Sequence, residues 1–371
     1  MNTPLPILMN DFKAEPAEIR VAMLEATRRV LESGWYVLGQ EVQAFERQWA
    51  ATCGVSHGIG VGNGMDAIEI AIRAAGIGPG DEVVTTAMTA FASVLAILRA
   101  GATPVLADID SDTGLMSVGS VKRCLSSRTK AVLLVHLYGQ VRAMDSWQAF
   151  CAEHDVLLLE DCAQAHLASW RGKVAGSFGL AGAYSFYPTK NLGAAGDAGM
   201  LVCNDPALSE KAGRLRNYGQ SVRYYHPELG MNSRLDEVHA AMLAARLPWL
   251  AAFTERRRAI ARAYDAGLAH PAVKKLAAPQ EPGAHVHHLH VLTSPYRDAL
   301  SRHLQQQGIQ VLVHYPVPVH HQDSCRNIRQ DPDGLEACER HAAECLSLPC
   351  HPQMQDEDVR RVIDAVNAWI V

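Results

Sequence analysis

The sequence predicts an α/β protein with a mostly parallel β-sheet covered by helices on both faces, followed by a smaller C-terminal α/β unit. Short apolar runs, such as residues 132–135 and 156–159, alternate with helical segments. Strands that are apolar on both faces are typical of parallel sheets buried between helices. After about residue 205 the segments become longer and richer in Ala, Leu and Arg. We therefore expect a large domain at residues 1–250 and a small domain at 251–371.

The individual elements follow from hydrophobic periodicity and from turn residues. Helices are expected at residues 16–33 and 40–52, with an exposed loop at 33–39. Strands are then expected at 58–64 (including a turn), 82–85, 103–108, 131–137 and 156–159, and helices at 66–75, 90–100, 118–124 and 146–154. In the sequence after residue 205 we expect helices at 206–217, 233–266 (kinked at Pro248), 297–307, 335–345 and 356–369. Strands are expected there at 285–292 and 309–313.

The composition excludes several classes of protein. The net charge of −5 gives no electrostatic case for a nucleic-acid or membrane partner. The N-terminal region carries Asp11, Lys13 and Glu15 and no long apolar run, which argues against a signal peptide. No stretch reaches the roughly 18 apolar residues that a membrane span needs. Nine scattered cysteines without a Cys-x-x-Cys pair indicate reduced cysteines in a cytoplasmic protein.

Two charged residues stand at informative places. Asp161 ends an apolar strand, where a carboxylate is costly without a cationic partner, and ligands of parallel sheets bind beyond such strand ends. Lys190 lies in a loop punctuated by Pro188 and Gly193. Taken singly, Asp161 could cap a helix and Lys190 could be a solvated surface residue. Taken together, they suit pyridoxal 5′-phosphate, which needs a lysine amine for its imine and a carboxylate for its pyridine nitrogen.

A phosphate group would also need backbone N–H donors at a helix N-terminus. Residues 62–66 (Gly-Asn-Gly-Met-Asp) precede a predicted helix and could supply them. An ordinary glycine-rich turn is the alternative. The segment does not match the dinucleotide fingerprint Gly-x-Gly-x-x-Gly, because Ala67 occupies the last position.

Three blocks extend this pattern to a family resemblance. They are Glu-Asp-Cys-Ala-Gln-Ala-His at 160–166, Ser-Phe-Tyr-Pro-Thr-Lys-Asn-Leu-Gly at 185–193, and Gly-Met-Asn-Ser-Arg-Leu-Asp-Glu at 230–237. With these blocks the chain resembles, nearly end to end, the DegT/DnrJ/EryC1/StrS sugar aminotransferases. The resemblance implies the type I (aspartate aminotransferase-like) fold of pyridoxal-phosphate-dependent transferases and a homodimer with active sites shared between subunits.

The resemblance also assigns roles to residues. It implies that Lys190 is the Schiff-base lysine and Asp161 the partner of the pyridine nitrogen, and that Gln164 packs near the 3-hydroxyl face of the cofactor. The implied phosphate ligands are Ser185, the backbone amides of Gly64 and Met65, and Asn232 from the other subunit. Two positions depart from the family pattern. Met65 lacks the hydroxyl often found there, and Ala90 replaces the aromatic residue that stacks on the ring, between Met88 and Phe91.

The activity implied is transamination from glutamate to a nucleotide-linked keto sugar, with Lys190 moving the proton. Residues 137–140, 232–236 and 314–320 resemble the branch that aminates C3 of dTDP-linked 3-keto-6-deoxyhexoses. The same resemblance places a group of side chains around the sugar nucleotide, with ordinary surface or packing positions as the alternative: Tyr36, Tyr224, Arg234, His314 and His320. A 4-keto sugar, a UDP sugar and an inositol-type (cyclitol) ketone stay open as acceptors.

The resemblance also bears on other functions. Sugar dehydratases that resemble this family carry histidine in place of the Schiff-base lysine, whereas this chain has Lys190. A non-catalytic regulatory protein on the same fold is disfavoured by intact Asp161, Gln164 and Lys190. A metal site is not expected. No Cys-His zinc spacing is present, and on a strand the pairs 285/287 and 288/290 of the histidine cluster would face opposite ways.

Overall fold

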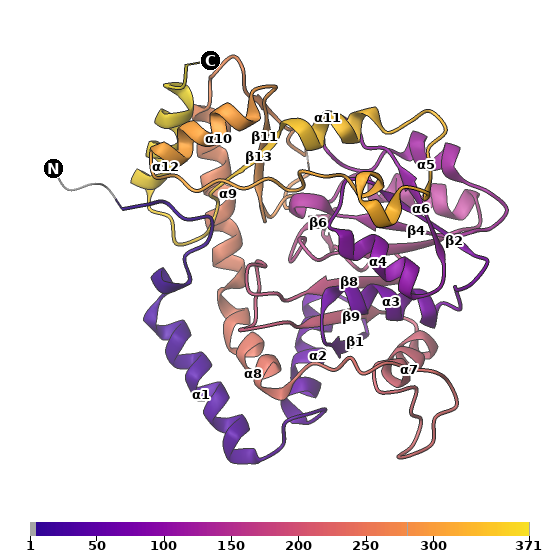
Figure 1. The fold of residues 1–371 in the computed structure, drawn as a ribbon. Coiled ribbons are helices and arrows are strands. Elements are labelled where there is room, and N and C mark those ends of the chain that lie inside the picture. The colour runs from indigo at the N-terminus through magenta and orange to yellow at the C-terminus, as the bar shows by residue number, and fades with distance from the viewer. Residues whose placement is uncertain (1–4, 280, 371) are drawn as a thin grey trace.

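The computed structural model describes residues 5–279 and 281–370 (Figure 1). Its largest element is an eight-stranded sheet of order β1-β9-β8-β5-β4-β2-β3-β12. β1 and β8 run antiparallel to β9, and the other neighbours are parallel. In sheet order the strands are His57–Val61, Gly199–Cys203, Ala181–Ser185, Leu157–Asp161, Thr129–Val135, Glu82–Thr86, Thr103–Ala107 and Arg329–Gln330.

Helices cover both faces of this sheet. One core cluster contains residues of α2 (Gln40–Cys53), α5 (Val118–Cys124), α6 (Met144–Glu153) and α8 (Glu237–Arg246). The other contains residues of α3 (Gly64–Ala74) and α7 (Pro206–Leu215) and part of α4 (Phe91–Arg99). Neighbouring strand residues alternate between the two clusters, so Leu158 lies in the first and Leu159 in the second. This is the three-layer arrangement that the apolar strands predict.

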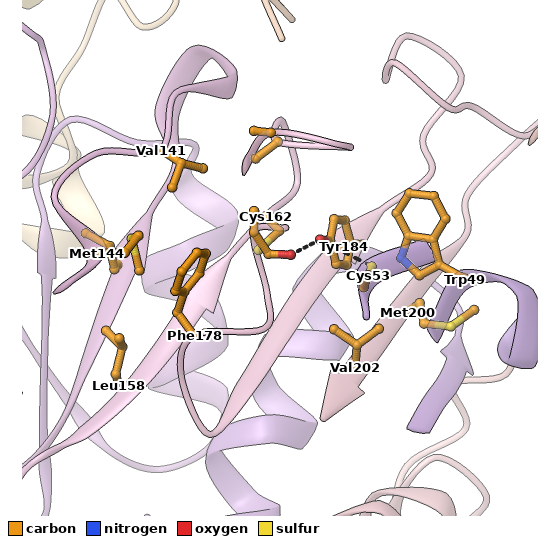
Figure 2. Close-up of a cluster of buried hydrophobic side chains, with 14 of the residues drawn as sticks. Trp49, Cys53, Val141, Met144, Leu158, Cys162, Phe178, Tyr184, Met200 and Val202 are labelled. Carbon is orange, nitrogen blue, oxygen red and sulfur yellow. Dashed lines mark hydrogen bonds between the residues drawn. The ribbon is translucent and has the colours of Figure 1, made fainter. Parts of the chain in front are cut away.

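Aromatic packing fixes α2 against β8, the third strand from the β1 edge of the sheet. The ring of Trp49 from α2 packs edge-on against Tyr184 and Phe186, with ring centroids 5.0 and 5.2 Å apart. Figure 2 shows Trp49, Tyr184 and Met200 from three separate elements in one buried cluster. The hydroxyl of Tyr184 donates to the Ala175 carbonyl, so its one polar group is satisfied inside the core.

The C-terminal part is built around a three-stranded antiparallel sheet of order β10-β11-β13 (Lys274–Lys275, His290–Thr293 and Cys345–Leu348). The helices of this part are α9 (Leu250–Gly267), α10 (Arg297–Gln306), α11 (Glu336–Glu344) and α12 (Asp356–Asn367). The remaining elements are α1 (Ala17–Ser33), the hairpin β6–β7 (Ser169–Trp170 and Lys173–Val174) and 3₁₀ turns at Phe12–Ala14, Leu137–Gly139, Leu247–Trp249, Val319–His321 and Asp323–Cys325.

Each of the two parts of the chain contributes a short segment to the other. Ile7 pairs with Ile309 and is buried in the C-terminal cluster, while β12 of the C-terminal region joins the large sheet beside β3. α1 packs against α8. The boundary at residue 250 falls at the first residue of α9, directly after the turn that contains Pro248, and it stays a prediction.

Most predicted elements are confirmed within a few residues, and the exceptions have physical reasons. The strand predicted at 309–313 is wrong, because this segment makes only the isolated bridges of Ile309 and Leu312. The strand predicted at 285–292 begins only at His290, because His287 adopts φ 44°. The helix predicted from 233 begins at Glu237. The strands β8, β9 and β13 were not predicted, because glycine-rich or very short segments carry little periodic signal.

No helix in residues 5–279 or 281–370 combines the length and the apolar character that crossing a membrane requires.

Replacement of the buried Trp49 tests the packing of the large sheet. Trp49→Ala removes a fully buried ring, so we expect the free energy of unfolding to fall by about 3–5 kcal/mol. Tyr296→Ala, at a side chain that is 50% exposed, serves as the aromatic control and should cost far less. Urea unfolding followed by circular dichroism measures both, and equal losses would contradict the assignment of Trp49 to the core.

Candidate active site

The sequence-predicted residues of the cofactor site meet at the carboxyl end of the large sheet. Asp161 is the last residue of β5, and Lys190 follows a tight turn after β8, where its backbone N–H donates to the Tyr187 carbonyl (2.8 Å). A Cβ on Gly193 would lie 2.3 Å from the Pro188 carbonyl oxygen, so this turn requires glycine. The glycine-punctuated loop around Lys190 is therefore a compact structure that positions the lysine.

Asp161 is buried and held by two donors. The Ser93 hydroxyl donates to Oδ2 (2.7 Å), and the Ala163 amide donates to Oδ1 (3.1 Å). Ser93 in turn shares a hydrogen bond with the Thr89 hydroxyl (2.8 Å). Across residues 5–279 and 281–370, no lysine, arginine or histidine nitrogen lies within 4.0 Å of the Asp161 carboxylate. A buried carboxylate without a cation is costly, so this one suits a positively charged ligand group.

Lys190 carries a perturbed amine. Burial lowers the pKa of Lys190 to about 8, while the negative charge of Asp161 acts in the opposite direction. The positive charge of Lys190 also helps to lower the pKa of His314 to about 4, after burial as the main cause. Asn191 anchors the following turn, because its amide donates to the Val286 carbonyl and its oxygen pairs with His288 Nδ1, both at 3.2 Å. An amine with this pKa can lose and regain a proton near neutral pH.

The N-terminus of α3 faces the end of β8. A Cβ on Gly64 would lie 2.7 Å from the Ser185 Cβ, so glycine is required for this close approach. Asn63 caps the helix by accepting from the Asp66 amide (2.9 Å). In the described part of the chain, the amides of Gly64 and Met65 have no hydrogen-bond partner. Free helix amides beside a hydroxyl form a site for a phosphate group.

Residues of the C-terminal region complete this neighbourhood. Gln164 accepts from the Tyr138 amide (2.6 Å) and donates to the Tyr315 hydroxyl (3.3 Å). His314, next to Tyr315, is held through its Nδ1 by the Ser347 hydroxyl (2.8 Å). The loop that contains His314 therefore reaches the same end of the sheet as Lys190 and Asp161.

Four other predicted residues make their contacts outside this group of residues. Asn232 is exposed, and its backbone is bridged to Asn217. Arg234 donates to the Asn217 side chain (3.2 Å) and lies over the Tyr218 ring. Tyr36 is 50% exposed and Tyr224 is 80% exposed. Asn232, Tyr36 and Tyr224 are thus exposed and Arg234 is partly buried, and within the described residues no hydrogen bond joins these four side chains to Lys190 or Asp161.

The histidines divide differently from the expectation. His320 pairs through Nε2 with Glu339 (3.0 Å) and has a side chain that is only 8% exposed.

The prediction that residues 288 and 290 share a face is wrong. The rings of His285 and His287 stack at 3.7 Å and His290 follows at 6.1 Å, whereas His288 pairs with Asn191 on the other side. The cause is the non-extended backbone at His287.

Three polar residues around the site were not predicted. Ser93 and Thr89 hold Asp161, and Tyr315 holds Gln164. The sequence could have pointed to Thr89 and Ser93, because both are polar residues that interrupt the apolar region 83–98. Tyr315 carried no such signal, because its contact joins residues 151 positions apart.

The residues present fit pyridoxal 5′-phosphate. Asp161 is a buried carboxylate without a cation, Lys190 has a lowered pKa, and Gly64 and Met65 offer free amides beside Ser185. Of the residues that flank Ala90, Met88 is fully buried, whereas Phe91 at the start of α4 is 37% exposed. Phe91 is therefore the flanking side chain still available to cover a ring.

Comparison with known proteins agrees with this fit. Residues 17–367 match the DegT/DnrJ/EryC1/StrS aminotransferase family. The dTDP-3-amino-3,4,6-trideoxy-α-D-glucose transaminase of Streptomyces venezuelae is 42% identical over 359 residues, which cover 97% of this chain and 95% of that protein. A pleiotropic regulatory protein of Geobacillus stearothermophilus is 40% identical over 368 residues, with coverage of 99% and 98%.

The fold agrees as well. The X-ray crystal structure of S. venezuelae DesV in complex with a ketimine intermediate superimposes with a TM-score of 0.95 at 41% identity and covers 99% of each chain. The chain therefore belongs to the DegT/DnrJ/EryC1/StrS family of pyridoxal-phosphate-dependent sugar aminotransferases, and its fold is of the aminotransferase type. The predictions of family, fold class, enzyme class and cofactor are confirmed.

The pKa of Lys190 is directly testable in the cofactor-free protein. Reductive methylation with ¹³C labels each lysine, and NMR then follows each amine as the pH changes; the signal absent from Lys190→Met is that of Lys190. We expect this signal to titrate near pH 8. Because the Asp161 charge raises this pKa, Asp161→Asn should lower it further. A midpoint near the ordinary value of 10.5, or a rise in Asp161→Asn, would contradict the assigned environment.

Proposed function

We propose that this protein transfers an amino group from glutamate to C3 of a nucleotide-linked 3-keto-6-deoxyhexose, with a dTDP sugar as the acceptor. The observation that carries the cofactor chemistry is the pairing of a lysine of lowered pKa with a buried, cation-free carboxylate at the end of β5. The position on the sugar is supported by the 42% identity to a transaminase that is named for a dTDP-3-amino sugar.

Each residue of the cofactor site has a proposed task. Lys190 is the attachment point of the cofactor. Asp161, kept in place by Ser93 and Ala163, would pair with the pyridine nitrogen and keep it protonated. Gln164, fixed by Tyr138 and Tyr315, lies near the 3-hydroxyl face. The phosphate is bound by a separate group of donors: the amides of Gly64 and Met65, the hydroxyl of Ser185 and the side chain of Asn232 from the second subunit.

Pyridoxal 5′-phosphate, when bound, supplies an electron-accepting ring that stabilises negative charge on the substrate carbon that loses its proton. The chain's own contribution is the proton transfer. When the Lys190 amine is free, its pKa of about 8 would keep a useful fraction of it neutral near pH 7. The neutral amine of Lys190 would accept the proton from the substrate carbon, and its protonated form would give the proton back. In the second half of the cycle, Lys190 moves the proton in the reverse direction for the keto sugar.

The sugar nucleotide is proposed to bind on the exposed side of the cofactor. Tyr36, Tyr224 and Arg234 are exposed or partly exposed and present a phenol, a second phenol and a guanidinium. Arg234 suits a phosphate because its fork of donors matches the oxygens of that group. His314 approaches from the C-terminal region. His320 is left out of the sugar-nucleotide site, because its side chain is only 8% exposed and its Nε2 faces Glu339.

A homodimer with shared sites accounts for the exposed apolar side chains. Trp35 is 64% exposed, Val222 65% and Leu229 88%. The loops that carry them are connected, because Val37 pairs with Asp236 and Asn217 pairs with Asn232. Exposed apolar side chains gathered on connected loops are typical of a protein–protein interface. A second copy covering these loops would bring its Asn232 to the phosphate site.

The function is tested first at the cofactor and then at the acceptor. The purified holoenzyme should absorb at about 400–430 nm, and Lys190→Ala should lose this band. Glutamate should shift the band in the wild-type protein. A protein that gains no band with added cofactor would contradict the proposal, and a band that glutamate leaves unchanged would point to another donor.

The acceptor is identified by turnover with dTDP- and UDP-linked 3-keto and 4-keto sugars and with a cyclitol ketone. We expect amine formation with the dTDP-linked 3-keto-6-deoxyhexose. Higher kcat/KM with a 4-keto sugar or a cyclitol would overturn the C3 assignment. No turnover with any of them, despite a glutamate-dependent shift, would favour a regulatory role like that in the name of the Geobacillus relative.

Shared active sites predict complementation between two defective subunits. Lys190→Ala and Asn232→Asp should each be nearly inactive as homodimers, the second because a carboxylate would repel the cofactor phosphate. Co-expressed subunits with different affinity tags should give hybrids in which one site has both native residues. The unfractionated mixture should then recover about a quarter of the wild-type rate. Lys190→Ala paired with Ser185→Ala is the control, because both residues belong to the same chain's site; recovery there would contradict the arrangement.

A further inference from the structure

Three potential metal ligands meet on the surface of the C-terminal region. His320 and His321 belong to the 3₁₀ turn Val319–His321, and Glu339 lies on α11. His320 Nε2 lies 3.0 Å and His321 Nε2 3.4 Å from Glu339 Oε1. The three ligand atoms all lie within 4.8 Å of one another. In Figure 1 the orange segment that carries this turn runs close to α11.

The two separations from the Glu339 oxygen fit a metal coordination shell, and the two histidine nitrogens lie within 4.8 Å of each other. A zinc ion with bonds of about 2.0–2.2 Å in tetrahedral geometry holds its ligand atoms about 3.4 Å apart. The observed separations of 3.0 and 3.4 Å are close to this value. Two imidazoles and one carboxylate are also a ligand set that first-row transition ions accept, with water in the remaining positions.

Burial and charge favour a cation at this place. The His320 side chain is only 8% exposed, and its Nδ1 has no hydrogen-bond partner in the described part of the chain. Its polar contact is therefore made through Nε2, toward Glu339. The side chains of His321 and Glu339 are 53% and 47% exposed, which leaves room for water ligands. The carboxylate of Asp108 also acts electrostatically on His320, so the local field adds a second negative charge.

Both ligand-bearing segments are fixed by backbone contacts. The Val319 amide donates to the Ala87 carbonyl (3.0 Å), which ties the turn to the segment after β2. The Asp108 carboxylate accepts from the amides of Ala337 (3.1 Å) and Cys338 (2.8 Å), which fixes the first turn of α11. The ligands are thus presented by two anchored elements, as a preformed site requires.

We infer that His320, His321 and Glu339 form a binding site for a divalent first-row transition ion, with zinc as the fitting probe. The bound ion ties residues 314–321, which reach the cofactor site through His314 and Tyr315, to α11. The site is structural, because its ligands do not contact the residues proposed to hold the cofactor. It differs from the sequence expectation of no metal site, which could not foresee that Glu339 meets two histidines 18 and 19 positions away.

The test uses untagged holoenzyme, dialysed to remove free cofactor, and titrates zinc by calorimetry. We expect one saturable site per chain. His321→Gln and Glu339→Gln should each weaken binding by more than the roughly 10–100-fold that loss of an outer-shell partner costs. His154→Gln is the matched control, since His154 is a surface histidine with one carboxylate, Glu153, at 4.0 Å, and zinc binding should be unchanged.

Two further measurements separate this site from an ordinary ion pair or from a cysteine site. X-ray absorption at the zinc edge should show two imidazoles and oxygen ligands. Hydrogen exchange of residues 319–325 should slow when zinc is added to the wild-type protein and not in His321→Gln. Absence of saturable binding, binding unaffected by both variants, or sulfur ligands would overturn the inference. The variants should unfold at the same temperature as the wild-type protein and keep the same visible band, which excludes misfolding. These readouts make the result independent of transaminase activity.

Discussion

The burial of two consecutive carboxylates at the end of β5 is the constraint around which the site is organised. Glu160 and Asp161 point to opposite faces of the sheet, because side chains alternate along a strand. Glu160 accepts from the amides of Gly176, Phe178 and Gly179 at 2.8–2.9 Å and pairs with His136. Asp161 receives one amide and one hydroxyl. Glu160 is therefore satisfied by the fold, whereas Asp161 keeps capacity for a charged ligand group.

The two neighbouring carboxylates therefore have different roles: Glu160 holds the fold together, and Asp161 remains available to a ligand. The donors to Glu160 fix the loop between β7 and β8, and β8 in turn carries Ser185 and leads to Lys190. Asp161 acts on Lys190 through charge, and its remaining acceptor capacity stays available to a charged ligand group. Segment 284–290 closes the arrangement from the C-terminal region. Val286 and His288 hold Asn191, so the position of the C-terminal part helps to set how deeply Lys190 is buried.

The predictable features are those that depend on local sequence. Apolar runs placed Asp161 at a strand end, and the glycines at 62–66 placed the N-terminus of a helix, which begins at Gly64. The unpredicted features depend on contacts between distant residues. The hydroxyl of Ser93 meets Asp161 across 68 positions, and Tyr315 meets Gln164 across 151. The strand predicted at 309–313 failed for a related reason: its apolar residues pack in the C-terminal core without a continuous hydrogen-bonded neighbour. Hydrophobic periodicity shows which residues are buried. Burial alone does not determine whether a segment forms the hydrogen bonds of a β-strand with a neighbouring strand.

The residues proposed for the substrate differ from those proposed for the cofactor, because they stand on exposed loops that are held at their ends. The loop 33–39 leads into α2, whose first amides are bound by the buried Glu237. Its carboxylate accepts from the amides of Gly39 (2.7 Å), Glu41 (2.8 Å) and Val42 (3.0 Å). The Tyr36 carbonyl accepts from the Glu237 amide in return. The loop's base is thus fixed to α8 while Trp35 and Tyr36 stay exposed. Such a loop can change its side chains without disturbing the sheet. A scaffold of this kind keeps one cofactor chemistry while the acceptor sugar varies.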